Sequence, residues 1–77
     1  MKARIFVTLK EGVLDPQGQA IQGALGSLGF NGVTSVRQGK VFDVELANGE
    51  DAQGRLRAMC EKLLANTVIE NYRVEIN

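Results

Sequence analysis

The first regular stretch of the chain is residues 3–10, where apolar side chains recur at every second position. The side chains that share one face are those of Ala3, Ile5, Val7 and Leu9, and those between them are Arg4, Phe6, Thr8 and Lys10. A period of two predicts a β-strand with one buried face. Gly12 is placed to end this strand.

Residues 16–28 have the spacing of a helix with one apolar face. Asp15 suits the N-cap, because its carboxylate can accept free amide hydrogens of the first turn, and Pro16 suits the next position, where a missing N–H costs nothing. Gly29 is a natural residue to end the helix. Gly23 and Gly26 each cost this helix up to about 1 kcal/mol relative to alanine. Tertiary packing is therefore expected to hold it together. The apolar positions are Ala20, Ile21, Ala24, Leu25 and Leu28.

The rest of the chain predicts three more strands and a second helix. Residues 33–38 form a weaker strand, and a tight reversal at residues 38–40 leads to residues 41–46, which alternate. The second helix carries an apolar stripe, and Asn66, which can take a left-handed conformation, follows it. Residues 72–76 alternate again and form the last strand. The stripe consists of Ala52, Leu56, Met59, Cys60, Leu63 and Leu64.

This order predicts an α+β fold in a single domain, residues 1–77. Crossover handedness and the short hairpin favour a two-layer, ferredoxin-like βαββαβ arrangement, with a four-stranded antiparallel sheet and two helices on one face. The first and third strands alternate most clearly and are expected at the centre. The predicted core side chains are Ile5, Val7, Leu9, Phe42, Val44, Leu46, Tyr72, Val74 and Ile76.

The size of the chain predicts association. A domain of 77 residues buries only about 60% of its unfolded surface. Cys60 is the only cysteine and there is no histidine, so neither a disulfide nor a usual zinc site is available to add stability. The sheet face opposite the helices is either solvated, with cross-strand ion pairs, or an association surface centred on Phe6 and Val41. We favour association and expect an oligomer or an obligate subunit of a larger assembly.

The charge pattern argues against two classes of partner. The chain has nine basic and nine acidic residues and no block of like charge, so neither nucleic acid nor an anionic membrane is favoured. Its apolar runs are too short to span a bilayer. The N-terminal residues lead directly into the first strand without the apolar core of a signal peptide, and we expect a cytoplasmic location.

No self-contained active site is predicted. The glycine-containing corner at residues 10–21 resembles a phosphate loop in composition, but Asp15 would place its own negative charge at the helix N-terminus and Pro16 removes an amide. Cys60 lies on an apolar stripe without a histidine to activate it. The pairs Asp43/Glu45 and Glu50/Asp51 suit solvated positions. Catalytic, cofactor-binding and metal-binding residues are all expected to be absent from this chain.

Two stretches are more specific than the general fold pattern. The residues FVTLKEGVLDPQG (6–18) and MCEKLLAN (59–66), the latter followed by VIENY (68–72), resemble the PurS family, the small subunit of phosphoribosylformylglycinamidine synthase. Leu28-Gly29-Phe30, Val33, Val36-Arg37 and Gly39-Lys40 also fit the family pattern, so the resemblance covers nearly the whole chain. Thr67, where a proline is common, is a departure.

The resemblance implies a non-catalytic adaptor in purine biosynthesis. Its partners would be a glutaminase subunit and a large synthetase subunit, and ATP and magnesium would be used by the synthetase. The resemblance also implies a homodimer or a higher homo-oligomer of this chain. The residues expected at the partner interface, besides Phe6, are Glu11, Leu14 and Gln17 at the corner and Arg37, Gly39 and Lys40 at the reversal. For Leu14, a hydrophobic staple onto its own helix is an equally good interpretation. The residues expected to have structural roles are Gly12, Asp15, Pro16, Gly29 and Asn66.

Two alternatives remain open from the sequence. A dimeric regulatory domain that binds an amino acid would need residues 29–33 to form a ligand loop. A small acylphosphatase-like hydrolase would need an arginine and an asparagine arranged around a phosphate. Neither alternative accounts for the two family-like stretches.

Overall fold

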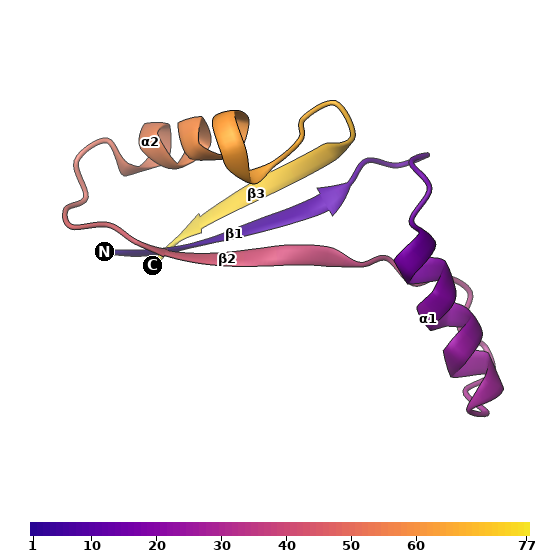
Figure 1. Cartoon of the computed structure of the whole chain (residues 1–77). Helices are drawn as coiled ribbons and strands as arrows, with labels where there is room; N and C mark the ends of the chain where they lie inside the picture. Colours follow the sequence, from indigo (N-terminus) through magenta and orange to yellow (C-terminus); the bar gives the residue numbers. More distant parts are fainter.

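The structure, a computed structural model that describes residues 1–77, is built on one antiparallel sheet of three strands (Figure 1). Strand β1 (Lys2–Leu9) lies between β2 (Gly39–Glu45) and β3 (Glu70–Ile76). Ile5 pairs with Phe42 on one side and with Val74 on the other. Because side chains alternate along each strand, the apolar sets of all three strands share one face.

The predicted four-stranded, ferredoxin-like sheet is wrong, because residues 33–38 form no strand. This segment bonds to side chains instead of to a neighbouring strand. Gln22 Nε2 donates to the carbonyl oxygens of Val33 and Thr34, at 3.4 and 3.2 Å. The reversal expected at residues 38–40 is also absent, since β2 begins at Gly39. With no fourth strand beside it, β2 is an edge strand and not a central one.

The prediction of two helices on one face is wrong as well. Helix α1 (Pro16–Ser27) lies beyond the end of β1 and extends away from α2 (Figure 1). Residues 28–38 return along it, and we call residues 16–38 the arm. The arm makes the molecule elongated, with extents of 49 × 25 × 14 Å. Its radius of gyration is 15.8 Å, against about 11.5 Å for a compact chain of this length.

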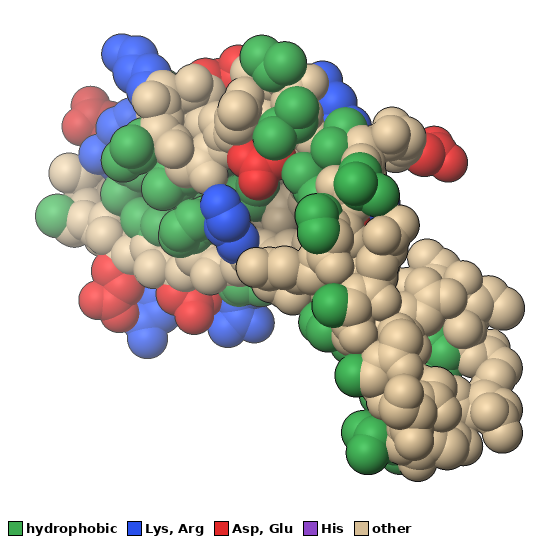
Figure 2. Space-filling model, turned by 45° about the vertical axis from the view of Figure 1, so that its right-hand side comes forward, with side chains coloured by type: hydrophobic (Ala, Val, Ile, Leu, Met, Phe, Trp, Pro, Cys, Tyr) green, Lys and Arg blue, Asp and Glu red, His purple; other side chains and the backbone are tan.

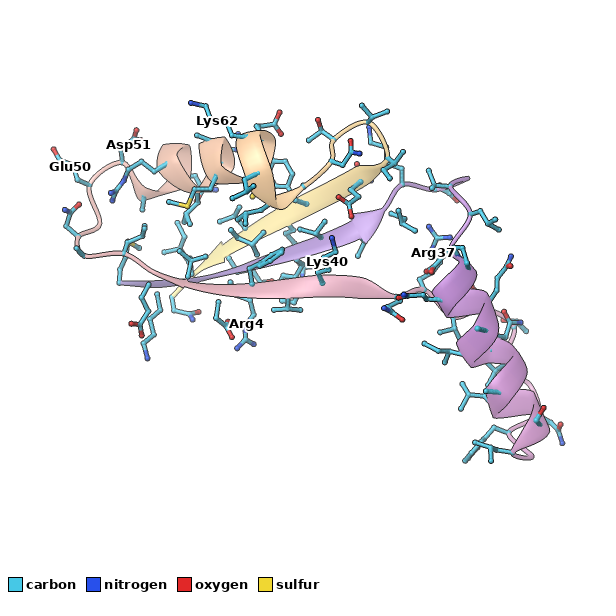
Figure 3. The ribbon with its side chains drawn as sticks, in the orientation of Figure 1. Arg4, Arg37, Lys40, Glu50, Asp51 and Lys62 are labelled. Atoms are coloured by element: carbon cyan, nitrogen blue, oxygen red, sulfur yellow. The ribbon has the colours of Figure 1, made fainter.

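One helical element covers the sheet. Helix α2 (Ala52–Met59) continues directly into the π-helical turn η1 (Cys60–Leu64), where the Ala65 amide donates to the Cys60 carbonyl oxygen at 3.0 Å. The wider turn rotates Leu63, part of the predicted stripe, outward, and its side chain is 83% exposed. Figure 3 shows Lys62 on the outer side of this element, away from the sheet.

The core is small and lies between β1 and the α2–η1 element. Its most deeply buried side chains are those of Ile5 and Val7 from β1 and Leu56 and Cys60 from the helical element. The remaining buried members are Ala3, Ala52 and Ala65. The half-buried side chains around it are Phe42, Val44, Leu46, Met59, Leu64, Tyr72 and Val74. No side chain of the arm belongs to either group, so the arm has no core of its own.

Candidate partner interface at the base of the arm

Asp15 fixes the arm to the sheet. Its carboxylate accepts the Gly18 amide at 2.8 Å, which caps the N-terminus of α1, and the Gln38 amide at 2.8 Å, which holds the returning segment. These two hydrogen bonds favour the charged form and keep the pKa of Asp15 below its usual value of 3.8. Pro16 occupies the first helical position, where no amide hydrogen is needed. One buried carboxylate therefore joins the two ends of the arm.

Arg37 closes the same corner from the other side. Its guanidinium donates to the carbonyl oxygens of Leu9 (3.3 Å), Lys10 (3.2 Å) and Val13 (3.1 Å). These carbonyls belong to the last residue of β1 and to the turn that follows it, and a planar guanidinium can reach several acceptors at once. Gly12 turns the chain here with a φ of +86°, a conformation that other residues seldom adopt. Arg37 is therefore a structural residue of the corner, in addition to being an exposed one.

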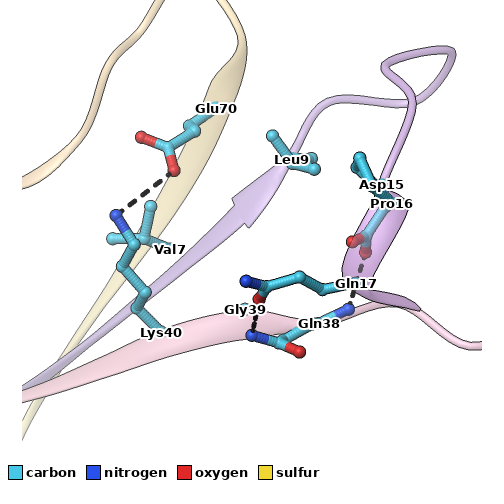
Figure 4. Close-up of a pocket in the computed structure, with 9 residues that line it drawn as sticks. All are labelled: Val7, Leu9, Asp15, Pro16, Gln17, Gln38, Gly39, Lys40 and Glu70. Atoms are coloured by element: carbon cyan, nitrogen blue, oxygen red, sulfur yellow. Dashed lines mark hydrogen bonds and ion pairs between the residues drawn. The ribbon is translucent and has the colours of Figure 1, made fainter. Parts of the chain in front are cut away.

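A crevice of about 400 Å³ lies between the corner and the sheet (Figure 4). The Lys40 ammonium and a Glu70 carboxylate oxygen approach to 3.9 Å across it, and Gln17 and Gln38 bond to each other through their side chains. The other Glu70 oxygen accepts the Asn66 amide at 2.6 Å. The complete lining is Val7, Leu9, Asp15, Pro16, Gln17, Gln38, Gly39, Lys40 and Glu70.

The groups in this crevice are paired with one another. Asp15 is occupied by two backbone amides, and Lys40 and Glu70 neutralise each other. No three carboxylate or thiol groups of the chain converge in a way that could hold a metal ion. This arrangement suits positioning of the arm and contact with another polypeptide.

The structure brings together four of the residues that the sequence placed at an interface. Gln17, Gly39 and Lys40 line the crevice, and Arg37 donates to the carbonyl oxygen of Leu9, which also lines it. Leu14 lies on the corner with 65% of its side chain exposed, so it does not fold back as a staple. Glu11 is exposed nearby.

Phe6 lies apart from these residues, on the opposite face of the sheet. It pairs with Val41, which is 55% exposed, and the Arg73 guanidinium lies 4.4 Å from the centre of its ring. Around it, Arg4 and Asp43 form an ion pair at 2.8 Å. The face combines cross-strand ion pairs with one stacked aromatic ring. Association through it remains a prediction.

Asn66 has a role that differs from the expected one. It does not take a left-handed conformation, and its side-chain oxygen accepts the Val68 amide at 3.2 Å. Its carbonyl oxygen accepts the amides of Ile69 and Glu70. Asn66 thus organises the loop into β3.

Gly29, with a φ of +93°, follows the last residues of α1 at the outer end of the arm.

Residues 29–33, which the alternative interpretation requires as a ligand loop, lie at the free end of the arm. All five are exposed, and they are remote from the crevice at its base (Figure 1).

Cys60 is buried in the core, and desolvation raises the pKa of its thiol. A buried neutral thiol packs as a small apolar group.

Two features of the site were not predicted from the sequence: the bond from the Gln38 amide to Asp15, and the exposure of the arm. A signal for the second feature is present, because residues 16–36 contain no charged side chain although 23% of the chain is charged. The bond between Gln38 and Asp15 has no signal in the sequence. It joins residues 23 positions apart, and its donor is a backbone amide, which nearly every residue carries.

Comparison with known proteins supports the family assignment over the full chain. The family described as "PurS: Phosphoribosylformylglycinamidine (FGAM) synthase" matches residues 2–77. The PurS subunit of phosphoribosylformylglycinamidine synthase from Bacillus subtilis is 50% identical over 76 residues, which cover 97% of this chain and 90% of that protein.

Solved structures agree with the assignment. The structure of B. subtilis PurS superposes with a TM-score of 0.91 at 49% identity, covering 99% of this chain and 96% of that one. A structure of PurLQS from Thermotoga maritima gives a TM-score of 0.80 at 36% identity, covering 96% and 93%. The three-stranded sheet with a projecting arm is therefore shared with solved structures. None of the helices combines the length and hydropathy that a membrane crossing requires. The chain belongs to the PurS family, the small subunits of phosphoribosylformylglycinamidine synthase, an enzyme of purine biosynthesis.

Proposed function

We propose that this chain is the non-catalytic adaptor of its synthase and holds a glutaminase subunit and a large ATP-dependent synthetase subunit together for ammonia transfer. The observation that carries the proposal is its likeness, over nearly its full length, to a chain in the PurLQS structure. The paired groups of the crevice support it, because each charge there is used to hold the chain's own elements in place.

The chemistry of the synthase explains why an adaptor is useful. Ammonia released from glutamine is protonated in neutral water and then has no lone pair for attack on an activated carbon. Transfer between two fixed active sites avoids that loss and keeps the local concentration of ammonia high. A subunit that only fixes the distance between two partners needs no nucleophile and no cofactor. ATP and magnesium are accordingly assigned to the synthetase, and the assembly to the cytoplasm, where these substrates are found.

The proposed contact with the partner subunits is the corner. Leu14 is an exposed apolar side chain in a polar surrounding, and a single such side chain that is buried on binding can anchor an interface. Glu11 and Gln17 lie three positions before and after it in the chain and are exposed, and Lys40 lines the neighbouring crevice. These polar groups can supply the rim of an interface. Arg37 contributes through the shape of the corner, which it holds with its three hydrogen bonds.

The proposal is tested by assembly. Purified glutaminase and synthetase subunits are mixed with and without this chain, and the mass of the resulting particle is measured by light scattering. We expect a particle that contains all three polypeptides only when the chain is present. A stable two-subunit particle of the same glutaminase and synthetase without the chain would contradict the adaptor role.

A further inference from the structure

An asparagine followed by a glycine occurs twice in the chain, at Asn31-Gly32 and at Asn48-Gly49. Asparagine is a thermolabile residue, because its side-chain carbonyl carbon lies within reach of the backbone amide nitrogen of the next residue. A glycine in that next position has no Cβ atom to obstruct the approach. All four residues are exposed, so exposure does not distinguish the two sites.

Hydrogen bonds hold Asn48 in one conformation. Its side-chain oxygen Oδ1 accepts the Glu50 amide at 3.0 Å and Nη2 of Arg55 at 3.2 Å. The same Arg55 nitrogen donates to the backbone carbonyl oxygen of Asn48 at 2.9 Å. The Gly49 carbonyl oxygen accepts the Ala52 amide at 3.3 Å. The side chain of Asn48 and the peptide unit that follows it are therefore both fixed, and attack of one on the other requires these bonds to break.

Asn31 lies in the turn at the free end of the arm and is held far less. The hydrogen bond that it makes is from its backbone amide to the Gly29 carbonyl oxygen, at 3.1 Å, and leaves its side chain free to rotate. Gly32 has a φ of +90°, a conformation that residues with a Cβ atom seldom adopt. The turn itself therefore requires the residue whose amide nitrogen is least obstructed.

A charge formed at this turn changes the character of the arm. Residues 16–36 carry no charge, and Figure 2 shows the projecting arm with hydrophobic and uncharged atoms but no acidic or basic side chain. A carboxylate in place of the Asn31 amide would be the first charged group in this stretch. The loop that carries Asn48 already contains Glu50 and Asp51, so the same change there would add to existing charge.

We propose that Asn31 is a site of spontaneous deamidation, which places a negative charge at the free end of the arm, and that the fold protects Asn48 from the same reaction. The Gly32 amide nitrogen attacks Cγ of Asn31, the bond from Cγ to the side-chain nitrogen breaks, and ammonia leaves with the proton of the attacking amide. Water then opens the cyclic imide at either carbonyl carbon and leaves an aspartate or an isoaspartate, the latter with an additional methylene group in the backbone. Water is the only co-reactant, and no atom is oxidised or reduced. The inference concerns this chain by itself and does not depend on the adaptor role.

The test is a time course of the purified chain at mildly alkaline pH. Peptide mapping by chromatography and mass spectrometry measures the asparagine, aspartate and isoaspartate forms at each site, so Asn48 is the matched control within every sample. We expect Asn31 to be converted at least about tenfold faster than Asn48, because the bonds that hold Asn48 must break before its ring can close. In guanidinium chloride, where the fold is lost, the two rates should become similar.

An Arg55→Lys variant tests the protection of Asn48 separately. It removes the nitrogen that reaches both oxygens of Asn48, and it should raise the conversion of Asn48 several-fold without changing that of Asn31. Far-ultraviolet circular dichroism shows whether the variant keeps its helices, and if it does not, the comparison in guanidinium chloride decides. Equal rates at the two sites in the folded chain, or a ratio of rates that stays the same in guanidinium chloride, would overturn the inference.

Discussion

Adding one methyl group at Gly18 tests whether the corner holds the arm rigidly. In a Gly18→Ala variant the new Cβ would lie 2.3 Å from the carbonyl oxygen of Val36 and 2.7 Å from an oxygen of Asp15. The nearer atom belongs to the backbone and cannot rotate away. Either α1 or the returning segment must move by about 1 Å to restore an ordinary contact, and that movement disturbs the hydrogen bond from Gln38 to Asp15.

The size of the effect follows from two opposing terms. Overpacking at a closely packed site costs about 1–3 kcal/mol. Replacing glycine by alanine inside a helix returns up to about 1 kcal/mol. The net destabilisation of the ordered arm therefore lies between about 0 and 3 kcal/mol, with about 1–2 kcal/mol as the central value. Gly23→Ala is the control, because a Cβ there meets nothing within 4 Å and only the favourable term remains.

The appropriate assay is amide hydrogen exchange along α1, measured for both variants at one protein concentration. Since α1 lies outside the core, the arm can open without global unfolding, and denaturation alone would underestimate the effect. We expect α1 amides to exchange roughly 5- to 30-fold faster in Gly18→Ala and somewhat more slowly in Gly23→Ala. Equal exchange in Gly18→Ala and the wild type would refute the view that the Asp15 corner holds the arm in one position.

Three further predictions concern the core, the corner and the partner contact. Leu56→Ala should lower the free energy of unfolding in urea by about 2–5 kcal/mol, because Leu56 is fully buried, whereas Leu63→Ala on the exposed side of η1 should change it by less than about 0.5 kcal/mol. Because the pKa of Asp15 is lowered in the folded state, the stability that its charged carboxylate gives the arm is fully present above pH 3.8 and is lost as the pH falls through the lowered pKa. In an acid titration, the α1 amides should lose protection from hydrogen exchange in that range, and Asp15→Asn should remove this pH dependence. Leu14→Ala should leave the circular dichroism spectrum unchanged and weaken assembly with the glutaminase and synthetase subunits, and full assembly of this variant would remove Leu14 from the contact.

Periodicity predicted the elements that contribute to the core. The alternation over residues 3–10 identified β1, and its strength reflects a strand with a neighbour on each side and a helix above it. Capping chemistry placed the start of α1, because Asp15 and Pro16 act through bonds within a few residues. The alternation and the capping pattern each depend on residues that are close together in the chain. The alternation is the clearer of the two because one face of β1 is buried in the core.

Periodicity and capping chemistry were insufficient where the structure depends on contacts between residues far apart in the chain. Residues 33–38 have only two apolar positions and no strand beside them, so their path is decided by Gln22, Asp15 and the end of β1. The spacing of α1 indicates an apolar face but does not say what covers it, and placing it on its own sheet was the simplest assumption. The π-helical turn also escaped prediction, since a single wider turn leaves no mark on a short apolar pattern.

The adaptor role is tested most directly by comparing two activities of the reconstituted synthase. Formation of formylglycinamidine ribonucleotide is measured with glutamine as the nitrogen source, and separately with ammonia added at high concentration to the synthetase subunit. We predict that glutamine-dependent synthesis requires this chain and that ammonia-dependent synthesis does not. If glutamine-dependent synthesis proceeds at the full rate without the chain, or if the isolated chain converts a substrate, the account is contradicted.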